Sequence, residues 1–258
     1  MLDFETVKGI KLHGREVKKL MHGADVLWQS GGGGYADAFA DNTWEQIVAA
    51  CQADAVPETW VVGDMKELDL GAVGVIHMQI AGLNVDDRAD GLGKAHISLL
   101  SKELYPTTLR MNPDLSPSSS PYTVGTGTIG GWEHSEMRAN LKSTIKPLFP
   151  SVVRSAIVPV TKTQKAYNTS GSSQTQTTQD DIWLPSRSEI KGTSAIYVTL
   201  FPDNESRKKY RLGTGTAASW WLRDAGAKNN FNYVTSTGTS DSNKRAMTAD
   251  YFVFGFCL

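Results

Sequence analysis

The chain has 258 residues, enough for one substantial domain and a small appendage. Apolar residues make up 40% and charged residues 21%, which supports a buried core and argues against global disorder. The formal net charge is −1, so the overall balance indicates neither nucleic acid nor an anionic membrane as a partner. The 24 glycines, with many serines and threonines, favour a loop-rich fold that contains β-structure.

The N-terminal segment, residues 1–29, contains a short internal repeat. Residues 12–17 (LHGREV) recur as residues 21–26 (MHGADV). Each His-Gly step predicts a turn, and the flanking apolar residues predict three very short antiparallel strands. Such a meander is too small to be stable alone, so we expect it to dock on the main domain or on another protein. The apolar residues available for this attachment are Val7, Ile10, Leu12, Val17, Leu20, Val26 and Trp28. The two histidines fit turn positions better than metal ligands.

Residues 30–34 are one serine and four glycines, which predict a flexible linker before a main domain over residues 35–258. The start of that domain predicts an amphipathic helix capped by Asn42 or Thr43. Its buried stripe consists of Trp44, Ile47, Val48 and Cys51. The N-terminus lacks the apolar core of a signal peptide, and no stretch has the length of a membrane span. We therefore expect synthesis in the cytoplasm.

Strands and loops alternate through the next part of the chain. Hydrophobic alternation predicts core strands over residues 73–81 and 95–100, and a shorter strand and turn over residues 60–64. The acidic loop, residues 84–91, lacks the spacing of an EF-hand. This favours solvated carboxylates, or a carboxylate paired with Arg88, over a calcium site.

A second helix is expected from residue 130 onward, with Met137, Leu141 and Ile145 buried. Ser135 or His134 would cap it, and Arg138 would pair with an acid in the core. A short third helix follows, capped by Ser151. Further strands are predicted over residues 157–161 and 250–258, and short buried strands or turns over residues 182–186 and 216–223. Polar loops are predicted over residues 112–121, 163–179 and 224–246.

The residues usually found in catalytic sites do not form a recognisable pattern. Glu133, His134 and Ser135 are consecutive and would point in different directions around a helix, so they form no relay by themselves. Two cysteines, Cys51 and Cys257, fall in apolar segments without zinc spacing, which predicts two separately buried thiols. We expect no catalysis, no cofactor and no metal. The basic run over residues 207–211 is expected to be a solvated strand edge rather than a contact for nucleic acid.

Aromatic residues inside the polar segment that follows Trp220 suggest a recognition surface, although a merely tolerant loop has the same composition. In a strand, Trp220 and Trp221 would face opposite sides, with one in the core and the other filling a second layer or meeting the loops. The candidate ligand-binding residues are Trp221, Arg223, Asn230, Phe231, Asn232 and Tyr233.

Seven motifs occur in order along residues 35–258: 62–66 (VGDMK), 80–87 (IAGLNVDD), 131–138 (GWEHSEMR), 157–162 (IVPVTK), 184–186 (LPS), 220–223 (WWLR) and 254–258 (FGFCL). With these motifs the domain resembles an uncharacterised family found in phages of Gram-positive and gut bacteria and in their prophages. The resemblance implies an α+β, C-type-lectin-like fold, as in formylglycine-generating enzymes: a twisted antiparallel sheet, two or three helices and long loops. Residues 1–29 resemble a segment that begins many phage tail, baseplate and fibre proteins.

The sequence departs from two groups of wider relatives. Cys51 and Cys257 do not resemble the reactive cysteines of the oxidase-type members. The Glu-Pro-Asn type tripeptide of calcium-dependent lectins is missing, so calcium-dependent sugar binding is not implied.

The resemblance implies a virion structural protein of a tail, baseplate or fibre that displays a lectin-like domain for host-surface recognition. Its expected partners are other virion proteins, through residues 1–29, and a host cell-surface glycan or protein. By analogy with tail fibres, a homo-oligomer such as a trimer is expected. The alternative is a capsid or tail decoration or assembly protein with no external ligand.

Overall fold

The computed structural model describes residues 10–12, 15–17, 19–22, 25–29, 34–116, 121–192 and 195–258. The chain forms two compact units, residues 1–60 and residues 61–258. The fold is α+β, with antiparallel sheets and a few short helices. Among the described residues, no helix has both the length and the apolar character needed to cross a membrane.

The described residues of the N-terminal segment form four short strands, where three were predicted. They are β1 (Ile10–Leu12), β2 (Arg15–Val17), β3 (Lys19–His22) and β4 (Asp25–Gln29). Each copy of the repeat closes its own hairpin, so that Leu12 pairs with Arg15 and His22 with Asp25. Of the seven predicted attachment residues, Val7 lies outside the described residues, and only the backbone is described at the other six. Residues 30–33 of the predicted linker also lie outside them.

The first unit continues with a 3₁₀ turn, η1 (Phe39–Asp41), and the predicted helix, α1 (Trp44–Gln52). Thr43 caps the helix: its hydroxyl accepts from the Gln46 backbone N–H at 3.3 Å, and its own N–H donates to the Gln46 side chain at 2.8 Å. The apolar stripe is buried as predicted, with Ile47 and Cys51 5% exposed or less.

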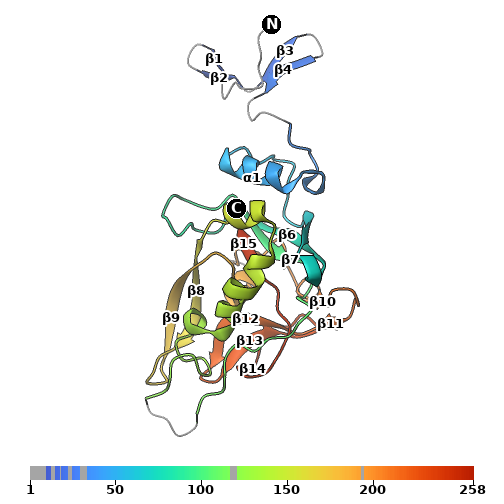
Figure 1. The fold of residues 1–258 in the computed structure, drawn as a ribbon. Helices are drawn as coiled ribbons and strands as arrows, with labels where there is room; N and C mark the ends of the chain where they lie inside the picture. Colours follow the sequence, from blue (N-terminus) through green and yellow to red (C-terminus); the bar gives the residue numbers. More distant parts are fainter. Residues whose placement is uncertain are drawn as a thin grey trace. The chain divides into compact units, whose positions relative to one another are not determined.

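Two antiparallel sheets occupy opposite ends of the second unit (Figure 1). The four-stranded sheet has the order β15-β7-β6-β5 and the three-stranded sheet the order β12-β13-β14. Their strands are β5 (Met65–Asp69), β6 (Val75–Leu83), β7 (Ile97–Ser101), β12 (Trp220–Ala227), β13 (Asn230–Val234), β14 (Ser242–Arg245) and β15 (Gly255–Cys257). Two further pairs complete the strands: β8 (Val160–Tyr167) with β9 (Ser173–Asp180), and β10 (Lys209–Tyr210) with β11 (Ala217–Ala218).

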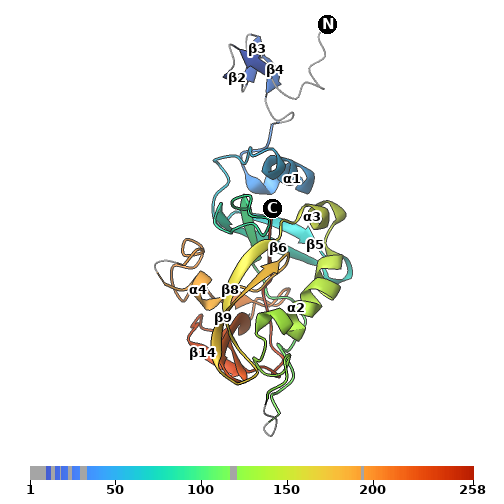
Figure 2. The same cartoon turned by 90° about the vertical axis from the view of Figure 1, so that its left-hand side faces the viewer.

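Short helices border these sheets; Figure 2 shows α2 and α3 along one side and α4 on the other side of the β8–β9 hairpin. The helices are η2 (Gly71–Val73), η3 (Trp132–His134), α2 (Glu136–Asn140), the π-helical η4 (Leu141–Ile145), η5 (Lys146–Leu148), α3 (Ser151–Ala156) and α4 (Arg187–Ile190). The predicted stripe of Met137, Leu141 and Ile145 is buried. Ser135 caps α2 by accepting from the Arg138 N–H at 3.1 Å.

Two segments that were predicted as loops are strands. Residues 163–179 lie largely in the β8–β9 hairpin, which pairs without a break from Val160 opposite Asp180 to Tyr167 opposite Ser173. Residues 224–246 contain the end of β12 and all of β13 and β14. The first prediction failed because inward side chains of the hairpin are polar: Lys162 and Gln164 are buried on β8 and bonded to other polar groups.

Three smaller predictions also differ. The basic run is not a solvated edge, since Arg207 and Lys209 are buried and donate to backbone carbonyls, Arg207 to Gly238 at 3.1 Å and Lys209 to Ser101 at 2.9 Å. Ser151 is the first residue of α3 and not its cap, a position that Pro150 takes. Residues 60–64 form turns and no strand.

Candidate functional site

The six predicted ligand-binding residues do not share a surface. Trp221, Arg223 and Phe231 are 0% exposed, which corrects their predicted placement at a ligand surface. Strands β12 and β13 place these side chains in the core. Of the others, Asn230 donates to Asn243 at 2.7 Å, and the Tyr233 ring contacts the Lys244 ammonium at 3.7 Å. Asn232 is half-buried on the same strand.

Arg223 instead belongs to a buried group of charged side chains. Its guanidinium donates to both carboxylate oxygens of Glu189, at 2.5 and 2.8 Å. It also donates to the Leu184 carbonyl at 2.6 Å and to the Gln164 side chain at 3.0 Å. Glu189 is held from the other side by the Ser186 backbone N–H at 2.7 Å, the reciprocal bond of the α4 capping box. The two charges are therefore paired and saturated with hydrogen bonds.

Lys162 joins this pair to a second carboxylate. Its ammonium donates to Glu189 at 3.0 Å, to Asp86 at 2.6 Å and to the Tyr197 hydroxyl at 2.9 Å. Tyr197 in turn donates to Asp86 at 2.6 Å, and so does Ser98 at 2.5 Å. Asp86 belongs to the acidic loop, residues 84–91, in which solvated carboxylates or a carboxylate paired with Arg88 are predicted. Asp90 does pair with Arg88, but Asp86 is buried. We call Asp86, Lys162, Glu189, Tyr197 and Arg223 the ionic cluster.

The charges in the ionic cluster shift one another's protonation. Burial lowers the pKa of Lys162, but the carboxylates of Glu189 and Asp86 outweigh it and raise that pKa above its ordinary value. Burial raises the pKa of Glu189, yet Arg223 and Lys162 together hold it at about 2. Burial and the nearby carboxylates raise the pKa of Tyr197 well above its ordinary value. At neutral pH the lysine, the arginine and Glu189 are therefore ionised, and Tyr197 keeps its proton.

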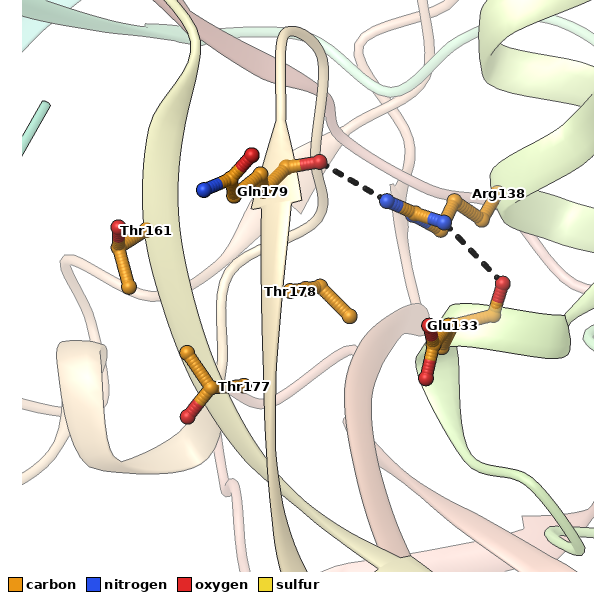
Figure 3. Close-up of a pocket in the computed structure, with 6 residues that line it drawn as sticks. All are labelled: Glu133, Arg138, Thr161, Thr177, Thr178 and Gln179. Carbon is orange, nitrogen blue, oxygen red and sulfur yellow. Dashed lines mark hydrogen bonds between the residues drawn. The ribbon is translucent and has the colours of Figure 1, made fainter. Parts of the chain in front are cut away.

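An open hollow of about 460 Å³ lies on the surface of the β8–β9 hairpin, which also carries Lys162 (Figure 3). Its lining combines carboxylate, guanidinium, hydroxyl and amide groups, and consists of Glu133, Arg138, Thr161, Thr177, Thr178 and Gln179. Pairing in the hairpin sets Thr161 opposite Gln179. Because side chains alternate along a strand, Thr161, Thr177 and Gln179 project from the outer face.

Arg138 connects α2 to this hairpin. It donates to Asp180 at 2.6 Å, to the Gln179 carbonyl at 2.9 Å and to the Glu133 carbonyl at 3.2 Å (Figure 3). This confirms the predicted pairing of Arg138 with a buried acid, since Asp180 is 0% exposed. Thr178 is buried, and its hydroxyl donates to Asp180 at 2.6 Å. With the guanidinium also engaged, the groups left to face a ligand are the Glu133 carboxylate, the hydroxyls of Thr161 and Thr177 and the Gln179 amide.

A second hollow of about 260 Å³ shares Gln179 with the first and is lined by Ala89, Asp90, Pro159 and Gln179. The Gln179 amide donates to the Ala89 carbonyl at 3.3 Å, where the two hollows meet. A hydrogen bond from Arg88 holds the pKa of Asp90 at about 2, so its carboxylate is ionised. We call the two hollows together the Gln179 groove. The sequence does not predict the groove, because Thr177, Thr178 and Gln179 lie in residues 163–179, a segment predicted to be a loop.

The described residues offer little for other chemistry at the groove. Its lining residues include no cysteine, serine, histidine or lysine. Across the part of the chain that the structure describes, no group of three or more His, Cys, Asp or Glu residues could hold a metal ion. Cys51 and Cys257 are free and buried, as predicted.

The second unit is thus an α+β domain with a polar surface groove over a buried ionic cluster. The chain belongs to the family described as "Domain of unknown function (DUF6273)", whose model matches residues 108–251, more than half of the chain. The matched range contains Glu133, Arg138 and the whole β8–β9 hairpin. No curated protein and no solved structure matches the chain.

Proposed function

We propose that this chain is a non-enzymatic binding protein of a bacteriophage particle, which takes a hydroxyl-rich ligand such as a host-surface glycan into the Gln179 groove. The observation that carries the proposal is the groove's lining of threonine hydroxyls, one amide and two carboxylates. Such groups pair with the alternating donors and acceptors of sugar hydroxyls. The α+β architecture is compatible with a variant of the C-type lectin fold, which is part of the proposal.

The groove also suits an extended ligand. Its two hollows meet at Gln179, so one chain of sugar residues could contact Glu133 at one end and Asp90 at the other. Both hollows are open to solvent, and the larger one is mainly polar, which favours modest affinity at each site. Display of several copies on a particle, as the expected homo-oligomer provides, would raise the overall affinity by avidity.

Binding can be tested with purified bacterial surface polysaccharides immobilised on a sensor, using the full chain. Gln179→Ala is expected to weaken binding about tenfold or more, because one bidentate amide contact contributes roughly 1–2 kcal/mol. The matched control is Gln174→Ala, an exposed glutamine on the same strand but outside the groove lining, which should bind like the wild type. Equal binding by both variants would remove the groove from the proposal. No binding to any polysaccharide would favour the decoration or assembly role.

Attachment to the particle is a separate part of the proposal. We propose that residues 1–29 dock on another virion protein, since two isolated hairpins, β1–β2 and β3–β4, have little stability of their own. A chain without residues 1–34 should still fold, as judged by its melting transition, but should no longer be incorporated into particles. Incorporation of the truncated chain would show that attachment uses another surface.

A further inference from the structure

One close contact in the ionic cluster joins an amine and a carboxylate that can react with each other. The Lys162 Nζ atom lies 2.6 Å from Asp86 Oδ1, and their side chains are 1% and 3% exposed. The two residues come from separate parts of the fold, Lys162 from β8 and Asp86 from the loop between β6 and β7. Glu189, from α4, places a carboxylate oxygen 3.0 Å from the same Nζ atom. The site thus holds a buried amine and a carboxylate in contact, the two groups that form an amide, and a second carboxylate that positions the amine.

We propose that Lys162 and Asp86 condense to an intramolecular amide, which cross-links β8 to the β6–β7 loop. The reaction is balanced without any co-reactant: an ammonium and a carboxylate become an amide and one water molecule. The new bond joins Lys162 Nζ to Asp86 Cγ, and the bond that breaks joins Asp86 Cγ to Oδ1. Two of the three ammonium protons leave with Oδ1 as water, and the third stays on the amide nitrogen.

The first of these protons can move directly to Asp86. Lys162 Nζ donates to Asp86 Oδ1 at 2.6 Å, and transfer along this contact frees the lone pair of Nζ for attack on Cγ. The second proton moves from the attacked nitrogen to the same oxygen, which then leaves as water. Glu189 Oε1 accepts another hydrogen bond from Nζ and holds the amine in position, while Arg223 keeps the Glu189 carboxylate ionised and fixed.

Two hydroxyls lie where negative charge develops during the attack. Ser98 and Tyr197 both donate to Asp86 Oδ2, at 2.5 and 2.6 Å. This is the arrangement of an oxyanion hole, with donors already directed at the oxygen that becomes more negative. The Trp183 ring covers Nζ at 3.7 Å, and both reacting groups are buried, so water has little access to reverse the step.

Burial also favours the product over the reactants. Four ionised groups, Lys162, Asp86, Glu189 and Arg223, meet in the core, and each carries a desolvation cost. Condensation removes one positive and one negative charge. It leaves Arg223 and Glu189, whose two hydrogen bonds already make a complete pair. The inference does not depend on the ligand of the Gln179 groove.

The test is the mass of the intact, denatured full-length protein. The wild type is expected to be lighter than its sequence by one water molecule, and a proteolytic digest should contain a peptide pair joined between residues 86 and 162. Lys162→Met should have its full sequence mass. The matched control is Lys209→Met, which removes another fully buried lysine, one that donates to a carbonyl and an amide oxygen and forms no ion pair with any described residue. This variant should keep the loss of water.

Two results would overturn the inference. One is a wild-type protein that keeps its full sequence mass after prolonged incubation in the folded state. The other is a loss of water that persists in Lys162→Met, which would place the dehydration elsewhere in the chain. If Lys162→Met does not fold, the digest of the wild type decides, because the joined peptides are either present or missing.

Discussion

Arg223 and Glu189 form a two-point ion pair in the core of the second unit, with hydrogen bonds of 2.5 and 2.8 Å. The pair connects β12 to α4, and the Arg223 hydrogen bonds to Gln164 and the Leu184 carbonyl add β8 and the segment before α4. One guanidinium thus ties together segments that the four-stranded sheet does not hold. Its five N–H donors in a fixed plane suit this role better than a lysine would.

Removal of this guanidinium should destabilise the second unit strongly. Arg223→Met leaves the Glu189 carboxylate buried with Lys162 and the Ser186 backbone N–H as its remaining partners, and loss of one partner from a buried pair costs about 3–5 kcal/mol. The free energy of unfolding in urea measures this. Arg245→Met is the control, because Arg245 is largely exposed and its ion pair with Asp114 should contribute less than about 1 kcal/mol. Similar losses of unfolding free energy in the two variants would show that Arg223 stabilises the fold no more than an exposed arginine does.

Lys209 predicts a specific dependence of stability on pH. Burial, with a smaller effect of the nearby Lys102, lowers its pKa from 10.5 to about 7, while Glu103 opposes the shift. Because the folded pKa is lower than the unfolded one, the unfolded chain binds more protons between about pH 7 and pH 10. Stability should therefore rise with pH across this window, by up to about 1.4 kcal/mol per pH unit. Below pH 7 the full cost of burying the charge is present.

Lys209→Met tests this dependence. Melting curves between pH 6 and pH 10 should show a rising stability for the wild type relative to the variant, with the largest advantage of the variant at the acidic end. Parallel pH profiles for the two proteins would show that Lys209 keeps an ordinary pKa or becomes solvated.

The two cysteines are predicted to be inert in the folded protein. Burial raises the pKa of Cys51 to about 12 and raises that of Cys257 as well, so neither forms a thiolate near neutral pH. A disulfide reagent at pH 8 should modify neither thiol in the native state and both in guanidinium chloride. Rapid modification of native protein would show that a buried thiol is reached through local opening.

The sequence predicts those elements in which apolar side chains face the core and polar side chains face the solvent. Helix α1 was predicted because Trp44, Ile47 and Cys51 recur at helical spacing, and the stripe of α2 and η4 was found in the same way. The β8–β9 hairpin was missed because its inward residues are polar. Lys162 is buried only because Asp86, 76 residues away in sequence, and Glu189, 27 residues away, supply its partners. Partners at that separation leave no local periodicity, so neither the ionic cluster nor the groove outside it could be predicted.

Gly131 is the N-cap residue of η3, and this position should tolerate no side chain. Its φ is +61°, and a Cβ atom there would lie 2.4 Å from the Ala166 Cβ atom and 2.4 Å from the Gln176 side-chain oxygen. Gly131→Ala should therefore combine backbone strain with a clash and lose about 2–4 kcal/mol of unfolding free energy.

Gly213→Ala separates the two causes, because Gly213 has a φ of +75° but nothing within 4 Å of the added atom. That control should lose only about 1–2 kcal/mol from strain, since a left-handed backbone is unfavourable for alanine. Equal losses would mean that the hairpin moves aside to accept the methyl group, and that β9 is less firmly held against η3 than its hydrogen bonds indicate.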